Sequence, residues 1–317
     1  MIVVYSDRYQ IDLGLHVFPT AKYSLIAGRL SADPRVEFTE PEPATWEQLA
    51  LVHTAEYLSK LRDGTMTPQD VDQLELPWSN AMVEGFRLMA GGTVQAGLLA
   101  TGLEVRSQKS EVRSWNASDF RLPTSDFRVV CHIGGGLHHA FPSHGEGFCP
   151  LNDVAVAARA LQSSGIERIA IVDLDVHHGN GTAFIFESDP RVFTFSMHQQ
   201  HNYPLWKPKS MLDVGLPDGA HDATYLRELE RALPKVVSHH PQCVFYLAGA
   251  DPYEDDQLGG LRLTKAGLRR RDRTVIETVR AAGIPLVITL AGGYARHVED
   301  TVAIHVATIE EALRSSG

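Results

Sequence analysis

The sequence lacks a long apolar run. None of its 317 residues lies in a stretch that approaches the roughly 20 consecutive apolar residues a membrane span needs. The first ten residues, MIVVYSDRYQ, lack the basic start and long apolar core of a secretory signal. Hydrophobic residues make up 44% and charged residues 21%, which is typical of soluble globular proteins. We therefore predict a cytoplasmic protein with no membrane partner.

Cysteine and positive charge are also scarce. The three cysteines are an odd number, and reduced thiols in the core are the expected state. With 29 Lys and Arg against 39 Asp and Glu, the net charge is -10, which would repel a phosphate backbone, so we expect no nucleic-acid partner. One basic cluster is expected to form the solvated face of a helix: Lys265, Arg269, Arg270, Arg271 and Arg273.

Short apolar runs alternate with helix-like segments along the chain, which predicts an α/β fold with a single parallel β-sheet flanked by helices on both faces. The runs expected as strands are Val3–Tyr5, Arg128–Cys131, Ile169–Val172, Val192–Ser196, Val244–Leu247 and Pro285–Leu290. The expected helices are Ala21–Leu30, Trp46–Asp63, Trp78–Ala100, Asn152–Ser163, Asp222–Ser238 and Thr264–Ala282. We predict one domain over residues 1–317, with a polar inserted loop at about 103–126.

Unusual polar residues follow four of the predicted strands. In open α/β sheets, ligands bind outside the carboxyl ends of the strands. In extended chain, residues two apart share a face, so Asp173, Asp175 and His177 project together. Asp251, at the end of another strand, is the best-placed further carboxylate, and a catalytic zinc needs three protein ligands and a water. A D-x-D-x-H string can also be a solvated loop, but the adjacent pair His138 and His139 favours a metal site with proton-handling groups.

These residues lie in motifs that resemble the histone deacetylase family of the arginase/deacetylase superfamily. The matching blocks are GGGLHHA (134–140), GEGFCPLNDVAVA (145–157), IVDLDVHHGNGT (171–182), LAGADPYEDDQLGGL (247–261) and LAGGYA (290–295). They occur in the family's order over most of the chain. Two early blocks, HVFPTAKY (16–23) and VHTAEYL (52–58), resemble compact bacterial and class IV members.

The resemblance implies one zinc per chain, held by Asp175, His177 and Asp251. It moves Asp173 out of the ligand set, because the matching family residue orients the residue that corresponds to His138. The remaining catalytic positions carried over are His139 as general base, Asn180 beside it, and Tyr294 as donor to the carbonyl oxygen. An amide instead of a carboxylate beside His139 should leave this histidine less inclined to hold a proton in the resting state.

The resemblance also implies a substrate tunnel and a second cation. Gly147, Phe148 and Tyr203 match its walls, and apolar Leu258 stands where polyamine-selective relatives carry glutamate. A structural potassium ion is expected near Asp173, Asp175, His177, Ser196 and Met197.

The expected activity is hydrolysis of acetyl or longer acyl groups from lysine side chains or a related small amine. Two alternatives stay open: a two-metal ureohydrolase of the arginase type, and a non-enzymatic binding module on the same fold. The sequence does not predict the oligomeric state.

Overall fold

The computed structural model describes residues 1–103 and 128–315, so the predicted loop at about 103–126 falls outside the described residues except for Leu103. Eight parallel strands form one sheet in the order β2-β1-β3-β8-β7-β4-β5-β6. The strands are β1 (Ile2–Val4), β2 (Glu37–Thr39), β3 (Val129–His132), β4 (Ile169–Asp173), β5 (Val192–Gln199), β6 (Leu212–Leu216), β7 (Cys243–Leu247) and β8 (Leu286–Thr289). The predicted fold class is confirmed.

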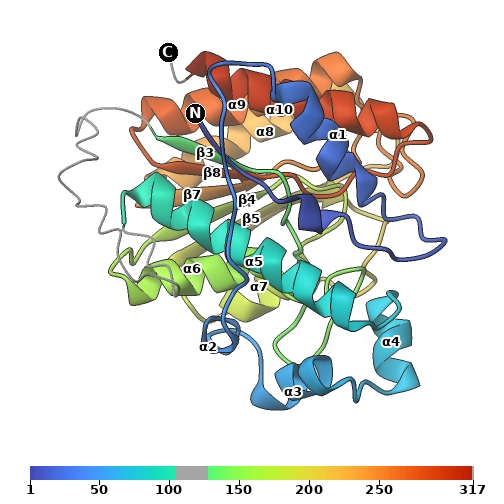
Figure 1. Cartoon of the computed structure of the whole chain (residues 1–317). Helices are drawn as coiled ribbons and strands as arrows, with labels where there is room; N and C mark the ends of the chain where they lie inside the picture. Colours follow the sequence, from blue (N-terminus) through green and yellow to red (C-terminus); the bar gives the residue numbers. More distant parts are fainter. Residues whose placement is uncertain (104–127, 316–317) are drawn as a thin grey trace.

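Helices cover both faces of this sheet. One face carries α1 (Ala21–Leu30), α8 (Asp222–Ser238), α9 (Lys265–Ala281) and α10 (Val298–Ser315), and the other carries α5 (Asn80–Thr101), α6 (Asp153–Ser163) and α7 (Asn180–Phe186) (Figure 1). The remaining elements precede α5: a 3-10 helix (Asp7–Tyr9), α2 (Trp46–Leu49), α3 (Ala55–Asp63) and α4 (Pro68–Leu74). No helix within residues 1–103 and 128–315 is long and apolar enough to cross a membrane.

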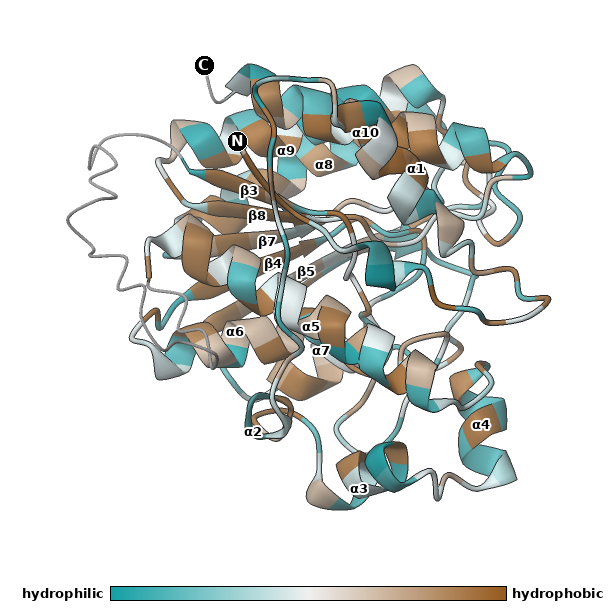
Figure 2. Cartoon of the chain, viewed as in Figure 1, coloured by the Kyte–Doolittle hydropathy of each residue, from teal (hydrophilic) through white to brown (hydrophobic). Residues whose placement is uncertain are grey.

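The central strands are apolar because they are covered on both sides. Every residue of β3, β4, β7 and β8 is buried, and these strands are coloured as hydrophobic in Figure 2. A parallel sheet between two helical layers needs such continuous apolar runs. The same four strands are neighbours in the sheet, in the order β3-β8-β7-β4. Their carboxyl ends therefore open side by side, and the loops that follow them meet at one edge.

The edges of the sheet and the short helices differ from the prediction. Strands β2 and β6 were not predicted, since both lie at the ends of the sheet and keep exposed positions. The helix predicted over Trp46–Asp63 is two helices, because the Thr54 side chain accepts a hydrogen bond from the Tyr57 backbone and caps a new start. Helices α4, α7 and α10 were also absent from the prediction.

One member of the basic cluster does not lie on a solvated face. Arg271 is fully buried, and its guanidinium lies 2.8 Å from the Asp272 carboxylate. It also donates to the backbone oxygens of Gly249, at 2.6 Å, and Leu174, at 3.3 Å. The prediction of a solvated side chain is therefore wrong for this residue. A buried, paired guanidinium holds together the loops that follow β4 and β7.

Candidate active site

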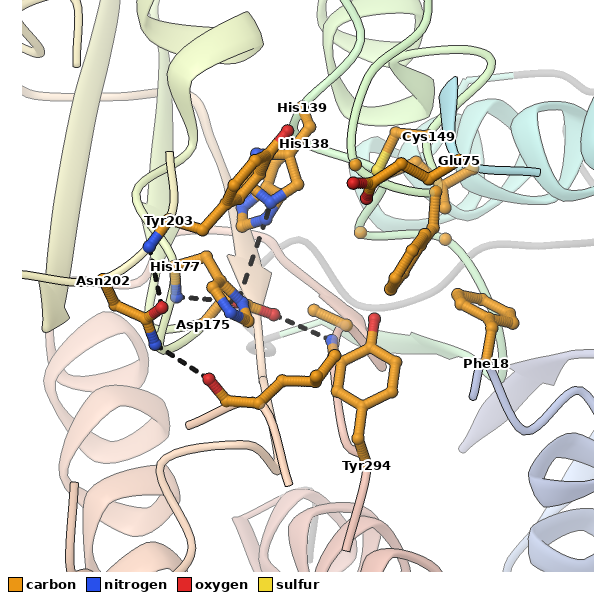
Figure 3. A pocket seen from close by; sticks show the side chains of 18 of the residues that line it. Phe18, Glu75, His138, His139, Cys149, Asp175, His177, Asn202, Tyr203 and Tyr294 are labelled. Carbon is orange, nitrogen blue, oxygen red and sulfur yellow. Dashed lines mark hydrogen bonds and ion pairs between the residues drawn. The ribbon is translucent and has the colours of Figure 1, made fainter. Parts of the chain in front are cut away.

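The loops after four neighbouring strands surround a cavity of about 300 Å³ at the carboxyl edge of the sheet (Figure 3). Its polar lining includes His138 and His139 after β3, Asp175 and His177 after β4, and Tyr294 after β8. These side chains are separated by up to 156 positions in sequence but face one space. The structure thus brings together the residues that the sequence placed at strand ends.

Asp175, His177 and Asp251 form a buried group of three metal-type ligands. One ligand atom from each lies within 4.8 Å of the others. His177 Nδ1 is 3.0 Å from Asp175 Oδ1 and 3.5 Å from Asp251 Oδ2. One imidazole and two carboxylates with room for a further ligand is the donor set of a catalytic zinc site.

The surroundings of this group fit a divalent cation. Asp251 Oδ2 is buried without a hydrogen-bond partner, which is costly unless a cation is bound there. Burial and the adjacent Asp175 carboxylate raise the pKa of Asp251 to about 7, because two buried negative charges repel each other. Gly292 leaves the space open, since a Cβ at this position would lie 2.0 Å from Asp251 Oδ2 and 2.5 Å from Asp175 Oδ2. The three residues can therefore hold a metal ion.

His138 is paired with a carboxylate. Its Nδ1 lies 2.7 Å from Asp173 Oδ2, and both side chains are buried. Burial alone would lower the pKa of His138, but Asp173 and Asp175 overcome that effect and raise the pKa to about 9. His138 is therefore the cationic member of the pair at neutral pH.

His139 is paired with an amide instead. Its Nδ1 lies 2.7 Å from Asn180 Oδ1, at the first residue of α7, and its Nε2 lies 3.0 Å from His138 Nε2. Burial, followed by the neighbouring His138 and His177, holds the pKa of His139 well below the usual value. Two adjacent imidazoles therefore differ in charge, an arrangement that suits separate acid and base roles.

Aromatic side chains form the walls of the cavity. The four residues predicted to bind the substrate all line it: Gly147, Phe148, Tyr203 and Leu258. The Tyr203 ring stands edge-on to His139, with ring centroids 5.0 Å apart. Gly147 has a φ of +52°, and a Cβ there would lie 2.8 Å from His139 Cδ2, so the backbone approaches the histidine closely. Such a slot suits an aliphatic chain better than a charged group.

Tyr294 closes one side of this cavity, with its phenol directed into it (Figure 3). Burial, reinforced by the charges of Asp175 and Asp251, raises its pKa well above the usual value. The phenol is therefore protonated and can donate. The backbone N–H of Tyr294 donates to Asp256 Oδ2 at 2.7 Å, and Asp256 Oδ1 accepts from Leu258 and Gly259.

Three residues that support the site were missed by sequence reasoning: Lys22, Glu146 and Asp256. Lys22 is fully buried, and its ammonium donates to the backbone oxygen of Ala291 at 2.8 Å and lies 5.6 Å from the Phe18 ring centroid. Lys22 lies within the block HVFPTAKY (16–23), but a single lysine on a helix is normally solvated, so its burial was not predicted. Glu146 and Asp256 lie in loops, so only the folded structure shows their partners.

The residues expected around potassium lie on two paired strands. Asp173 on β4 is in register with Ser196 on β5, and Met197 follows it as a buried residue. The Ser196 hydroxyl is 3.0 Å from His198 Nδ1, so this histidine has a partner within its own strand. Potassium binding there stays a prediction.

Comparison with known proteins agrees with this site. The model of the histone deacetylase domain family matches residues 16–309, so the chain belongs to the histone deacetylase family. An uncharacterized protein of Picosynechococcus is 40% identical over 309 residues, 96% of this chain and 95% of the relative. Histone deacetylase 2 of Arabidopsis thaliana is 30% identical over 323 residues, 95% of this chain and 77% of the relative.

Solved structures agree on the fold. The crystal structure of a histone deacetylase homologue from Aquifex aeolicus superposes with a TM-score of 0.77 at 24% identity, covering 98% of this chain and 83% of that one. The predicted family and fold are confirmed, and membership supports a deacetylase activity on an acylated amine. The likeness to class IV members stays a prediction.

Proposed function

We propose that this protein is a zinc-dependent deacylase that removes acetyl or longer acyl groups from lysine side chains or a related small amine. The observation that carries the proposal is the position of the Asp175, His177 and Asp251 group beside two histidines, one cationic and one neutral. A protonated phenol, that of Tyr294, faces the same cavity. Amide hydrolysis needs these parts: an electrophilic centre, a base and a donor to the carbonyl oxygen.

Asp175, His177 and Asp251 would hold the zinc ion. When bound, zinc supplies a Lewis acid that polarises the acyl carbonyl and lowers the pKa of a water molecule. Backbone hydrogen bonds hold the two carboxylates in place. The backbone N–H of Gly292 donates to Asp175 Oδ2 at 2.8 Å, and that of Val176 donates to Asp251 Oδ1 at 2.9 Å. Such outer hydrogen bonds orient ligands.

The two histidines would divide the proton transfers. Neutral His139 accepts the proton of the attacking water, because its low pKa leaves it uncharged at neutral pH. It then passes this proton to the leaving amine. His138, held by Asp173, keeps its positive charge beside the reacting centre and stabilises negative charge that develops there.

Tyr294 would stabilise the carbonyl oxygen as it becomes negative. Its hydroxyl keeps its proton at neutral pH, since burial raises its pKa well above the usual value. The Asp256 carboxylate fixes the backbone of the Tyr294 loop, which keeps the phenol aimed into the cavity. A preorganised donor of this kind acts mainly in the transition state.

The lining of the cavity suits a substrate with a neutral amide at the end of an aliphatic stem and positive charge elsewhere. Phe148, Tyr203 and Leu258 supply apolar walls, and Glu75 contributes a carboxylate. No lysine or arginine is among the residues that line the cavity in the described part of the chain. An acidic surrounding attracts basic substrates such as acyl-lysine peptides.

The test is a substrate panel combined with metal analysis. Zinc-loaded protein is assayed on lysine peptides from acetyl to myristoyl, on acetylated polyamines and on small amides. We expect hydrolysis of at least one acyl-lysine peptide, loss of activity on chelation, and recovery with one equivalent of zinc per chain. His139→Ala should be inactive while remaining folded and zinc-loaded. Two equivalents of manganese per chain would favour a ureohydrolase, and no hydrolysis across the panel would refute the proposal.

A further inference from the structure

The side-chain amide of Asn180 lies between two partners, one bonded to its oxygen and the other to its nitrogen. On one side, Asn180 Oδ1 lies 2.7 Å from His139 Nδ1. On the other side, Asn180 Nδ2 lies 2.7 Å from Glu146 Oε1. An asparagine side chain alone can face either way, because its oxygen and nitrogen ends have nearly the same shape. The direction must therefore be set by whichever partner cannot change its own role.

Glu146 is that partner. An ionised carboxylate only accepts hydrogen bonds, so the NH₂ group of Asn180 must point to Glu146 and its oxygen to His139. The Glu146 side chain is 18% exposed, and its Oε1 also accepts from the Tyr203 hydroxyl at 3.0 Å. Burial opposes ionisation, but His144, Asn180 and Tyr203 prevail and hold the pKa of Glu146 below its usual value.

The consequence reaches the ring of His139. Since Asn180 Oδ1 can only accept, His139 Nδ1 must carry the proton, and Nε2 presents its lone pair towards His138 Nε2. Nε2 is the nitrogen nearest His138, at 3.0 Å, on the side of the cavity. A histidine that is to act as a base must present a lone pair on that side.

We propose that Glu146 is a positioning residue that selects the tautomer of His139 by fixing the orientation of the Asn180 amide. It takes the part that a carboxylate in direct contact with the histidine would play, but acts through a neutral amide. Glu146 thereby orients His139 without placing a full negative charge against its ring. The catalytic role of His139 is taken from the proposed function, whereas its tautomer can be observed independently.

The same carboxylate couples the base to the tunnel wall. The Tyr203 hydroxyl donates to Glu146, and the Tyr203 ring stands edge-on to the His139 ring, with the two ring centroids 5.0 Å apart. Helix α7, which begins at Asn180, is tied to the histidine loop by the Thr182 N–H, which donates to the backbone oxygen of His138 at 3.0 Å. The Asn180 amide therefore has a fixed backbone, and only its terminal group is free to flip.

The kinetic test exchanges the donor and acceptor roles. Glu146→Gln is nearly isosteric but can offer either end to Asn180, so we expect kcat to fall by about 10- to 100-fold, with KM nearly unchanged. Asn180→Asp should also lower kcat, because two carboxylates then face each other. In the double variant Glu146→Gln/Asn180→Asp, the new amide can donate to the new carboxylate, and that carboxylate still accepts from His139. We therefore expect kcat to recover above the Asn180→Asp variant but to stay below the wild type, because a carboxylate then faces His139.

Additive losses in the double variant would overturn the proposal, since independent sites show no such coupling. Glu187→Gln, an exposed change at the end of α7, is the matched control and should leave kcat and zinc content unchanged. Thermal unfolding and zinc content of each variant separate misfolding from mispositioning.

A second readout does not depend on activity. The ¹⁵N resonances of the histidine rings, with His139 assigned by comparison with His139→Ala, report which nitrogen carries the proton in the zinc-loaded protein. We expect protonated Nδ1 in the wild type and a mixed or reversed tautomer in Glu146→Gln. An unchanged tautomer in Glu146→Gln would refute the inference even in a fully active enzyme. A shifted tautomer in a protein inactive on every substrate would uphold it and refute the proposed function alone.

Discussion

Lys22 permits a quantitative test of the electrostatics around the site. It has no exposed surface, and the only hydrogen bond of its ammonium among the described residues is to the Ala291 backbone. Burial lowers the pKa of Lys22 from 10.5 to about 8, against the opposing charges of Asp251, Asp175 and Asp256. A shift of roughly 2.5 units, at 1.36 kcal/mol per unit, corresponds to about 3 kcal/mol of stability lost when this lysine is buried with its charge.

The sign of the pH dependence follows from proton binding. Between about pH 8 and 10.5 the unfolded chain holds the Lys22 proton and the folded chain has released it, so folding becomes more favourable as pH rises. The cost is fully present below about pH 8. By about pH 9.5, roughly 2 of the 3 kcal/mol should have been relieved.

Lys22→Met removes the buried charge and keeps the volume of the stem. It also leaves the Ala291 carbonyl without this donor, at a cost of about 1 kcal/mol. We therefore expect the variant to be more stable than the wild type by about 2 kcal/mol at neutral pH, and this advantage to vanish near pH 9.5. Urea denaturation at several pH values measures the difference, and contributions of other titrating groups cancel between the two proteins.

Lys235→Met, on the exposed side of α8, is the control for charge removal alone and should change little at any pH. A stability difference for Lys22→Met that does not vary between pH 7 and 9.5 would refute the lowered pKa of Lys22 in the folded protein.

Two further predictions concern the cavity. Tyr294→Phe should lower kcat on an acetyl-lysine peptide by about 10²- to 10³-fold, the loss expected for one oxyanion donor. KM should stay nearly unchanged, because the ring centroid still lies 6.0 Å from that of Phe148. Equal kcat values for the variant and the wild type would exclude the phenol from the reaction. Gly147→Ala should lower both thermal stability and kcat, since its Cβ would meet His139. Gly165 also has a positive φ but has open space around it, so Gly165→Ala should lower thermal stability and leave kcat unchanged.

The central part of the fold could be predicted because its signal is local. Strands such as Ile169–Asp173 are buried at every position, so the sequence has a continuous apolar run there. The edge strand β6 alternates exposed and partly buried residues and includes a glycine, which is a weak signal for a strand. Helix α10 buries Thr301, His305 and Thr308 along with apolar residues, so its buried face is not a clear apolar stripe.

The site residues could be predicted because of their positions relative to the strands. Asp173, Asp175 and His177 follow a recognisable strand, and the order of strands in an α/β sheet brings such ends together. Lys22 lies on α1 and Glu146 lies late in the loop between β3 and α6, and their partners lie 269 and 34 positions away. Pairings of this kind depend on how the loops and helices pack, which no periodicity in the sequence records.

The two histidines show how a fold assigns different tasks to identical side chains. His138 and His139 are adjacent, buried and 3.0 Å apart at Nε2, so burial does not distinguish them. Their partners do. Asp173 offers a full negative charge and retains a proton on His138, whereas Asn180 offers only a dipole and leaves His139 neutral. A general base must be unprotonated before the reaction, whereas a histidine that stabilises negative charge must be protonated. The difference between one carboxylate and one amide therefore determines which histidine can take the proton, and the orientation of that amide determines from which nitrogen.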